Sequence, residues 1–274
     1  MSIRGRSLPA GWYPSDAAET RRMLRSFGEQ VAVSRLDVPA NAAIAPHAGW
    51  AYSGRCAWTA WSAAADADCA VVVGGHLPGG RGFLSAPADI METPLGELRL
   101  DAELDTFVRD RLVAVPDRNV DNTVEVHLPM LKARFPDALV GWFRAPNGSE
   151  AAELGSCLAE YAKQTGKRIF VLGSTDLTHY GPSYGWSPAG GGAAGRTWAR
   201  EADEAIVKAF TALDVEAAIR LARERAASCS VGAAIAAMTY AREMGRTSGV
   251  VLDMYSSADL APGDSFVGYC SVAF

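Results

Sequence analysis

The sequence predicts an α/β layered domain, and three observations support that prediction. Short apolar runs typical of buried strands alternate with helical patterns from one end of the 274-residue chain to the other. Small or turn-forming residues and histidines follow several of these runs, where open α/β sheets bind their ligands. No internal repeat, low-complexity linker or shift in composition divides the chain, so we expect a single domain over residues 1–274.

The amino-terminal elements follow from capping and hydrophobic patterns. Asp16 and Glu19 resemble a capping box, and apolar residues then recur at helical spacing, which predicts a helix over Asp16–Gln30. Ala42–Ala45 is predicted to be a short buried strand that stops at Pro46. The next elements are expected to be a helix over Gly54–Ala65 and a continuous apolar strand over Cys69–Val73.

The later elements are predicted in the same way. Prolines and short alternating pieces in Ala86–Asp101 indicate a hairpin or excursion, and the glycine-rich segment Gly181–Gly195 is expected to be a mobile loop. The remaining expectations are, in chain order, helices Asp101–Leu112 and Asn122–Arg134, strand Ala138–Arg144, helix Glu150–Thr165, strand Arg168–Leu172, helices Arg196–Phe210, Val215–Arg225 and Val231–Met244, and strands Gly249–Met254 and Ser265–Phe274.

Charge and composition exclude several classes of partner. The chain has 26 Lys and Arg against 31 Asp and Glu, with the basic residues scattered, so nucleic acid is not expected as a main partner. No stretch reaches the roughly 20 apolar residues of a membrane span, and no apolar segment follows the basic residues of the N-terminus. The five cysteines form no CxxC pair, which favours free thiols and a cytoplasmic location.

All four histidines lie beside small or turn-forming residues. His47 and His76 follow predicted strands, His179 lies shortly after another, and His127 precedes Leu128-Pro129. A single such histidine is more often a core or loop residue with satisfied ring nitrogens. Several together, three of them near strand ends, favour a metal site whose ligands are spread along the sequence.

Three further residues are candidates with alternatives left open. Cys229 precedes a predicted helix whose dipole would lower the thiol pKa, although a buried structural cysteine is equally compatible with the sequence. Asp176 lies three residues before His179 and could accept its ring N–H or cap a short helix. Glu125 and His127 are two residues apart in a predicted helix, so at most one points into a site.

The chain resembles the Memo-like proteins, called AmmeMemoRadiSam system protein B in bacteria and archaea. The PHAG and SSDxxH elements are the specific part of the resemblance. The matching segments are Gly11-Trp12-Tyr13-Pro14, Ala45-Pro46-His47-Ala48-Gly49-Trp50-Ala51-Tyr52-Ser53-Gly54, Thr93-Pro94-Leu95-Gly96, Val124-Glu125-Val126-His127-Leu128-Pro129, Ser174-Thr175-Asp176-Leu177-Thr178-His179-Tyr180-Gly181 and Ser265-Phe266-Val267-Gly268-Tyr269.

The resemblance implies a fold and a set of site residues. Memo-like proteins share a three-layer α/β/α sandwich around a mixed sheet with the class III extradiol dioxygenases, whose non-haem iron lies at strand ends. By this resemblance the metal ligands are His47, His76 and Cys229. It further implies that His179 acts as acid or base with Asp176 beside it, and that His127 lines the same pocket.

The sequence departs from the family pattern in three places. Gly74-Gly75-His76 replaces GPxH, and Cys229 is followed by Ser230 rather than by the glycine of CGxxP, but both ligands stay in place. Asp121-Asn122-Thr123 replaces the family's EHS, so Asn122 stands where the family has a histidine. That change indicates an altered substrate or a weaker site.

The expected function is metal-dependent. Two histidines and one thiolate suit iron, with copper or zinc as alternatives, and leave an open coordination position. With iron or copper we expect a redox enzyme of dioxygenase type that acts on a small organic substrate. There are two alternatives: a zinc hydrolase, and a non-catalytic adaptor that binds a peptide or small ligand in the same pocket. The family name also implies radical-SAM and AMMECR1-like proteins as partners.

Overall fold

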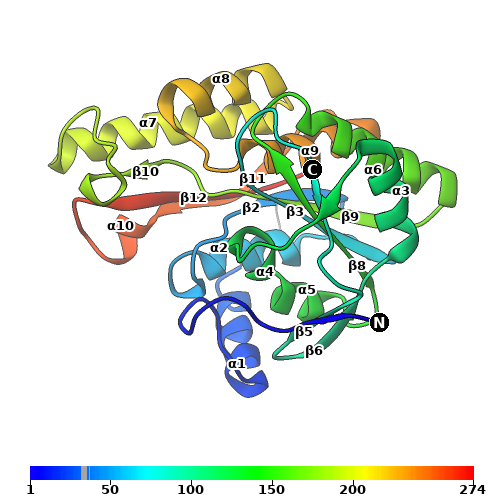
Figure 1. Ribbon diagram of the computed structural model, residues 1–274. Helices are drawn as coiled ribbons and strands as arrows, with labels where there is room; N and C mark the ends of the chain where they lie inside the picture. Colours follow the sequence, from blue (N-terminus) through cyan, green and yellow to red (C-terminus); the bar gives the residue numbers. More distant parts are fainter. Residues whose placement is uncertain (32–35, 37) are drawn as a thin grey trace.

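A mixed sheet with helices on both faces forms the three layers of the protein, as the computed structural model shows for residues 1–31, 36 and 38–274 (Figure 1). The sheet has nine strands among these residues, in the order β10-β12-β2-β9-β3-β8-β4-β7, with β11 paired to β12. The expected three-layer α/β/α sandwich around a mixed sheet is therefore confirmed. Strands from the first third and from the C-terminus of the chain lie side by side in this sheet.

Four parallel strands form the centre of the sheet. They are β2 (Ala42–Ala45), β9 (Ile169–Ser174), β3 (Cys69–Leu77) and β8 (Leu139–Pro146). The antiparallel strands β12 (Phe266–Ala273) and β11 (Val250–Ser256) continue it beyond β2. The other strands of this sheet are β4 (Leu84–Ser85), β7 (Val115–Pro116) and β10 (His179–Tyr180). A second sheet contains β1 (Ile3–Arg4), β5 (Ile90–Thr93) and β6 (Gly96–Arg99).

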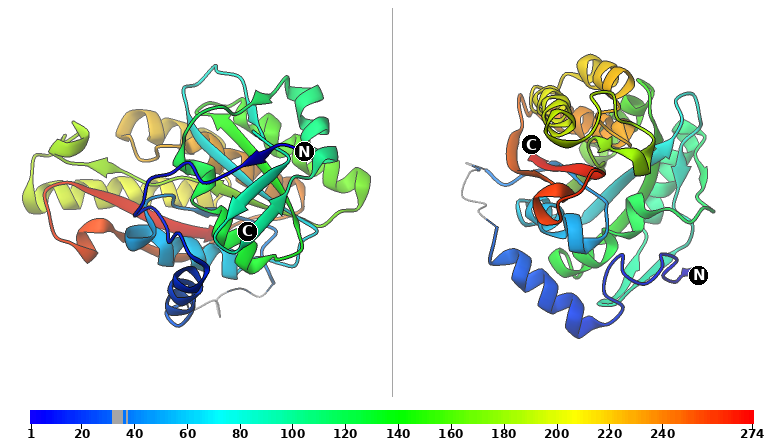
Figure 2. Two further views of the ribbon diagram at one scale, coloured as in Figure 1. Left: turned by 60° about the horizontal axis from the view of Figure 1, so that its bottom comes forward. Right: turned by 90° about the vertical axis from the view of Figure 1, so that its left-hand side faces the viewer.

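The helices are divided between the two faces of the sheet, and the views in Figure 2 keep α7 and α8 on the face opposite α1. One face carries α3 (Ala102–Leu112), α6 (Ala151–Thr165), α7 (Gly192–Thr211), α8 (Val215–Arg225) and α9 (Val231–Glu243). The other carries α1 (Ala17–Gly28), α2 (Trp50–Ser62), α4 (Asn122–Glu125) and α5 (Leu128–Arg134). Two short elements, η1 (Pro182–Tyr184) and α10 (Ser257–Leu260), lie beside β10 and β12.

Alternation along the central strands builds two hydrophobic cores. Successive side chains of a strand point to opposite faces. In β3, Val71 and Val73 join the core under α6 and α9, whereas Ala70 and Val72 join the core under α2 and α5. Because both faces are covered, these strands are apolar along most of their length, and polar residues such as His76 and Arg144 come only near their carboxyl ends.

Most predicted elements are present with ends shifted by a few residues. Val215–Arg225 is a helix with the predicted bounds, and Asp16 caps α1 by accepting a hydrogen bond from the Glu19 backbone N–H at 2.9 Å. The predicted hairpin within residues 86–101 is the antiparallel pair β5 and β6. No helix in the described ranges is long and apolar enough to cross a membrane.

Three predictions require correction. The helix predicted over Asn122–Arg134 is two short helices, because the chain turns at Val126 and restarts with Pro129 in the first turn of α5. The strand predicted to end at Val73 continues to Leu77 and so includes His76. Helix α7 begins at Gly192, inside the predicted loop; the mobility of the preceding residues stays a prediction.

Candidate metal centre

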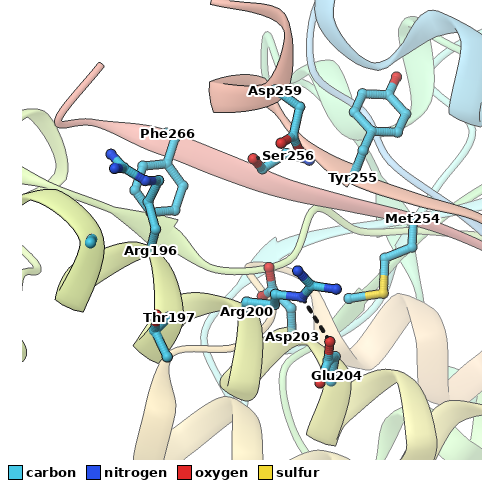
Figure 3. A pocket seen from close by; sticks show the side chains of 11 residues that line it. Arg196, Thr197, Arg200, Asp203, Glu204, Met254, Tyr255, Ser256, Asp259 and Phe266 are labelled. Carbon is cyan, nitrogen blue, oxygen red and sulfur yellow. Dashed lines mark hydrogen bonds and ion pairs between the residues drawn. The ribbon is translucent and has the colours of Figure 1, made fainter. Parts of the chain in front are cut away.

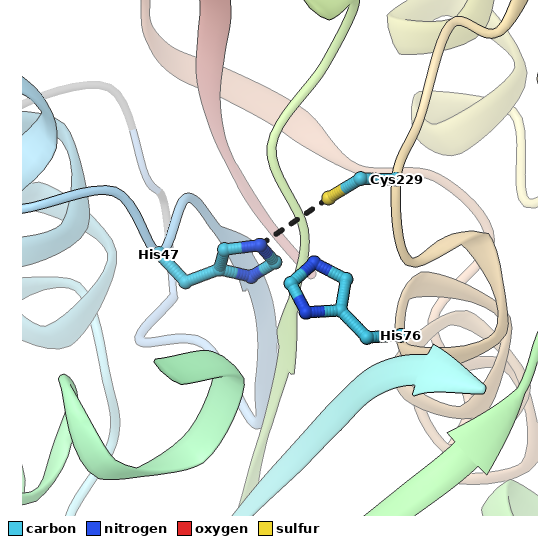
Figure 4. A group of neighbouring side chains, drawn as sticks. All are labelled: His47, His76 and Cys229. Carbon is cyan, nitrogen blue, oxygen red and sulfur yellow. Dashed lines mark hydrogen bonds between the residues drawn. The ribbon is translucent and has the colours of Figure 1, made fainter. Parts of the chain in front are cut away.

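Three side chains from distant parts of the sequence converge beyond the carboxyl ends of the parallel strands. His47 follows β2, His76 lies near the end of β3, and Cys229 lies just before α9. One donor atom from each residue lies within 4.8 Å of the other two (Figure 4). The Cys229 Sγ lies 3.2 Å from His47 Nε2, and the two imidazole rings meet edge to face with their centroids 4.9 Å apart.

His47 is held so that its Nε2 faces the cluster. The residue is almost completely buried, and its backbone N–H donates to Asp176 Oδ1 at 2.7 Å. Its Nδ1 lies 2.9 Å from the Ser174 hydroxyl oxygen. A metal-binding histidine commonly has its second ring nitrogen engaged in this way, because that contact sets the tautomer and the orientation of the ring.

His76 is also held through its Nδ1, which contacts a carboxylate. Its Nδ1 lies 3.1 Å from Asp121 Oδ2, and its backbone has a positive φ of 57°. The preceding Gly75 is packed so closely that a Cβ there would lie 2.4 Å from the Ser230 Cβ. The glycine thus allows His76 to approach the start of α9, and Nε2 is again the ring nitrogen left for the cluster.

The surroundings of Cys229 favour its thiolate form. Burial raises the pKa of its thiol, but the neighbouring imidazoles of His47, His179 and His76 outweigh burial and bring the pKa well below its ordinary value. Helix α9 begins two residues after Cys229, at Val231, so the thiol lies just before the N-terminus of a helix as the sequence predicted. Asn147 Nδ2 donates to the Cys229 carbonyl at 2.9 Å, which ties this segment to the end of β8.

His179 and Asp176 lie beside the cluster. Asp176 Oδ2 is 3.6 Å from His179 Nε2, and no hydrogen-bond partner for that buried ring nitrogen lies among the residues that the structure describes. Burial lowers the pKa of His179, but Asp176 and the Cys229 thiolate outweigh it and raise this pKa to about 10. An imidazole with an unsatisfied ring nitrogen, in the same cavity as His47 and His76, fits a site that receives a ligand.

His127 does not line the cavity, which corrects the expectation drawn from the family. The ring is fully buried, with Trp61 Nε1 donating to its Nδ1 at 3.3 Å and its Nε2 3.1 Å from the Ser174 hydroxyl oxygen. Because an indole N–H only donates, the proton of the neutral ring is on Nε2. The Ser174 oxygen can accept hydrogen bonds from both His127 and His47. His127 therefore helps to position the candidate ligand His47 through Ser174. Burial lowers its pKa to about 3.

Glu125 points away from the metal centre, which agrees with the prediction that at most one of Glu125 and His127 faces a site. Its carboxylate accepts hydrogen bonds from the Ser7 and Leu8 backbone N–H groups at 2.8 Å each and from the Tyr13 hydroxyl at 3.1 Å. It therefore fastens the N-terminal segment to α4.

A cavity of about 490 Å³ opens onto the cluster. Asn122 lies in its wall and donates from Nδ2 to the His47 carbonyl at 2.9 Å, so the amide that replaces the family histidine faces this space. Such a volume suits a small organic molecule. Its aromatic walls are Trp12, Tyr52, Tyr184 and Tyr269.

A larger cavity of about 740 Å³ lies between α7 and the β11–α10–β12 segment (Figure 3). It shares no lining residue with the cavity of the cluster: Phe266 lines the larger cavity and the adjacent Val267 the smaller one. The buried Asp203 lines the larger cavity, and burial raises its pKa to about 7. No histidine or cysteine lines this space, so the smaller cavity is the better candidate for chemistry despite its size.

The cluster suits a borderline or soft transition metal. Two imidazole nitrogens and one thiolate match the preferences of iron, copper and zinc, whereas magnesium and calcium prefer oxygen ligands. His47, His76 and Cys229 could hold an ion, and a set of three protein ligands would leave it a coordination position for a further ligand.

The structure adds four site residues that we did not single out in the sequence. Ser174 and Asp121 each engage the Nδ1 of a candidate ligand, Arg144 binds Asp121, and Asn147 holds Cys229. Ser174 and Asp121 do lie within motif segments. Arg144 and Asn147 give no such signal, because each lies at the end of an ordinary apolar strand.

Comparison with known proteins finds similarity over nearly the whole chain. The family model described as Memo-like protein matches residues 4–273. A MEMO1 family protein of Methanosarcina barkeri is 30% identical over 278 residues, covering 98% of this chain and 99% of the relative. One from Archaeoglobus fulgidus is 26% identical and covers 99% of both chains. The crystal structure of an uncharacterized Escherichia coli K12 protein matches with a TM-score of 0.52 at 13% identity, covering 84% of this chain and 98% of that one.

Proposed function

We propose that this chain, which belongs to the Memo-like family, binds one metal ion through His47, His76 and Cys229 and uses it for redox chemistry on a small organic substrate. One observation carries the proposal: three donor atoms lie within 4.8 Å of one another, while the Nδ1 of each histidine is engaged elsewhere. A pair of imidazoles fixed in this way presents both Nε2 atoms to the same point.

Iron is the metal that we propose first, with copper or zinc as the alternatives. Iron or copper would supply electron-transfer and dioxygen chemistry at this site, whereas zinc would supply Lewis-acid chemistry. The thiolate donor and the family relationship to a dioxygenase-like fold favour the redox choice.

The chain's own residues bind the substrate and move the proton. The aromatic cavity walls would hold a small organic molecule against the cluster, and the Tyr184 ring lies 5.0 Å from the His179 ring. His179 is about one-third exposed to the cavity, and Asp176 beside Nε2 stabilises its protonated form. We therefore assign proton donation and acceptance to His179, the positioning of His47 and His179 to Asp176, and support of His47 to His127.

The other parts of this proposal concern location and partners. All five cysteines are unpaired, which favours the cytoplasm. Partners of the radical-SAM and AMMECR1-like types follow from the family name. A zinc hydrolase, or an adaptor that binds a peptide without turnover, would use the same cavity.

Metal content tests the proposal directly. Protein is purified anaerobically as wild type, as Cys229→Ser and as Cys157→Ser; the control residue is a buried cysteine of α6. We expect stoichiometric metal and a thiolate-to-metal absorption band in wild type and Cys157→Ser, and loss of both in Cys229→Ser. Equal, negligible metal in all three would overturn the metal-binding proposal.

Oxygen uptake then separates the candidate functions. Iron-loaded protein that consumes oxygen with a small aromatic or other organic substrate supports the redox enzyme. Activity with zinc alone would favour hydrolysis. Ligand binding without turnover under either metal would favour the adaptor.

A further inference from the structure

The candidate ligand His76 lies in an irregular part of the sheet. Strand β3 pairs with β8 in parallel up to Gly74 and Arg144, and pairing resumes at Leu77 and Pro146. Between these points two residues of β3, Gly75 and His76, oppose one residue of β8. A bulge of this kind redirects a side chain, but it leaves main-chain groups without partners in the ladder.

Arg144 satisfies one of these groups. Its side chain is almost completely buried, and its Nε donates to the Gly75 carbonyl at 2.8 Å. Gly75 immediately precedes His76, whose φ of 57° is unusual for a residue with a side chain. The guanidinium thus holds the main chain where it turns the imidazole toward the cluster.

The same guanidinium reaches the His76 side chain through Asp121. Arg144 Nη2 lies 3.0 Å from Asp121 Oδ2, and that oxygen is 3.1 Å from His76 Nδ1. The second carboxylate oxygen accepts from the Thr123 backbone N–H at 2.9 Å and also contacts its hydroxyl. Asp121 therefore has little freedom to rotate away from the imidazole.

Arg144 is itself anchored on its far side. Its Nη1 lies 3.4 Å from Oδ1 of the fully buried Asp117, and Asp117 Oδ2 accepts from Trp142 Nε1 at 3.3 Å. A planar guanidinium can make these contacts at once, whereas a lysine ammonium is a single point on a flexible chain. The two carboxylates around this one arginine, of which Asp117 is fully buried and Asp121 is partly buried, leave an excess negative charge beside His76, which favours a cation at the cluster.

We propose that Arg144 is the positioning residue of the metal centre: it fixes His76 through the Gly75 carbonyl and through Asp121, and so determines where the His76 Nε2 lies. This inference rests on the proposed metal binding but is separable from it by experiment. It assigns a role to an arginine of β8 that contacts none of the three candidate ligand side chains directly in the described structure.

The test compares Arg144→Lys and Asp121→Asn with the matched control Asp101→Asn. Asp101 is also a buried carboxylate, bound to Lys167 Nζ at 3.0 Å and to the Leu104 backbone N–H at 3.1 Å, but it lies at the opposite edge of the strands. Co²⁺ is titrated into each apo-protein, and the thiolate-to-cobalt band reports occupancy. Unfolding by urea reports stability in the same samples.

We expect Asp121→Asn and Arg144→Lys to weaken Co²⁺ binding by about 10- to 100-fold, the usual effect of losing a partner of a metal-bound histidine. Asp101→Asn should lose stability without this loss of affinity. Unchanged Co²⁺ affinity in both site variants, or an equal loss in the control, would overturn the inference.

A metal-independent measurement separates this inference from the proposed function. In the apo-protein, NMR of ¹⁵N-labelled histidine should show a His76 Nδ1 proton protected by Asp121, and both site variants should lose that protection. If wild type shows this proton but binds no Co²⁺, the positioning role stands and the metal proposal fails. If wild type lacks the proton, the positioning role fails whatever the metal does.

Discussion

The two ends of the parallel strands differ in their polar side chains. At the amino ends, called the amino edge here, acidic and basic side chains pair with one another. At the carboxyl ends, the carboxyl edge, histidine, cysteine and aspartate side chains converge on one point. Arg168 Nη2 lies 2.6 Å from Asp68, and Lys167 Nζ lies 3.0 Å from Asp101. At the other edge the His47, His76 and Cys229 donor atoms lie within 4.8 Å of one another, and the buried His179 Nε2 has no hydrogen-bond partner among the described residues.

The difference shows that in this sheet the stabilising ion pairs and the candidate functional groups lie at opposite ends of the parallel strands. Paired charges at the amino edge satisfy each other, and water screens the exposed pair. At the carboxyl edge the backbone is less regular and the polar groups depend on buried partners: Ser174 for His47, and Asp121 for His76. Groups left directed at a common point are what a ligand site requires, and the surrounding core must offset their burial.

The largest change is expected when the buried carboxyl group of Asp203 ionises. Asp203 accepts from the Thr178 backbone N–H at 2.9 Å, and burial raises its pKa from 3.8 to about 7. Because the folded protein binds this proton more tightly than the unfolded chain, stability falls as the pH rises from about 4, where the unfolded chain loses the proton, to about 7, where the folded protein loses it. The full effect is about 4 kcal/mol. Asp203→Asn should remove that part of the pH dependence.

Urea unfolding of wild type and Asp203→Asn at about pH 5 and about pH 8 checks this prediction. Both proteins keep His127, whose lowered pKa acts in the opposite direction because protonation destabilises the folded state as the pH falls. The difference between the two proteins therefore isolates Asp203. Parallel pH profiles would contradict the prediction.

An intermediate effect is expected from Ser174→Ala. The substitution removes the hydroxyl that lies between His47 Nδ1 and His127 Nε2 and leaves both buried nitrogens unsatisfied. We expect a loss of about 2 kcal/mol in the free energy of unfolding and about 10-fold weaker metal binding.

Ser85→Ala is the matched control for that experiment. Ser85 is equally buried in β4, but its hydroxyl has no hydrogen-bond partner in the described part of the chain. The control should keep wild-type metal affinity and lose little stability. If both alanine variants behave alike, Ser174 has no special role at the carboxyl edge.

The smallest effect is expected at the amino edge from Asp68→Asn. Hydrogen bonds from Arg168 lower the pKa of Asp68 to about 2, but the pair is largely exposed and is screened by salt. Thermal unfolding should shift slightly at low ionic strength and not at high ionic strength, and Co²⁺ affinity should not change. A clear loss of metal affinity would remove the functional distinction between the two edges.

The sequence predicted the layers of the fold and the candidate metal ligands, but not the residues that hold those ligands in place. Apolar runs such as Ala42–Ala45 and the helical pattern of Val215–Arg225 depend on local periodicity, so they could be placed from the chain alone. The resemblance to the Memo-like family named His47, His76 and Cys229, and the structure brings these three together. The structure places His127 outside the cavity: the residue lies at the break between α4 and α5, and its ring is buried in the core.

Local residue patterns were sufficient to specify strands, helices, their order and the motif segments, because each depends on neighbours within a few positions. The tertiary structure alone decided that Ser174 supports His47, that Asp121 and Arg144 support His76, and that the bulge in β3 turns His76 toward Cys229. These contacts join residues separated by tens of positions or more. Strand order and register bring them together, and no short-range pattern encodes either.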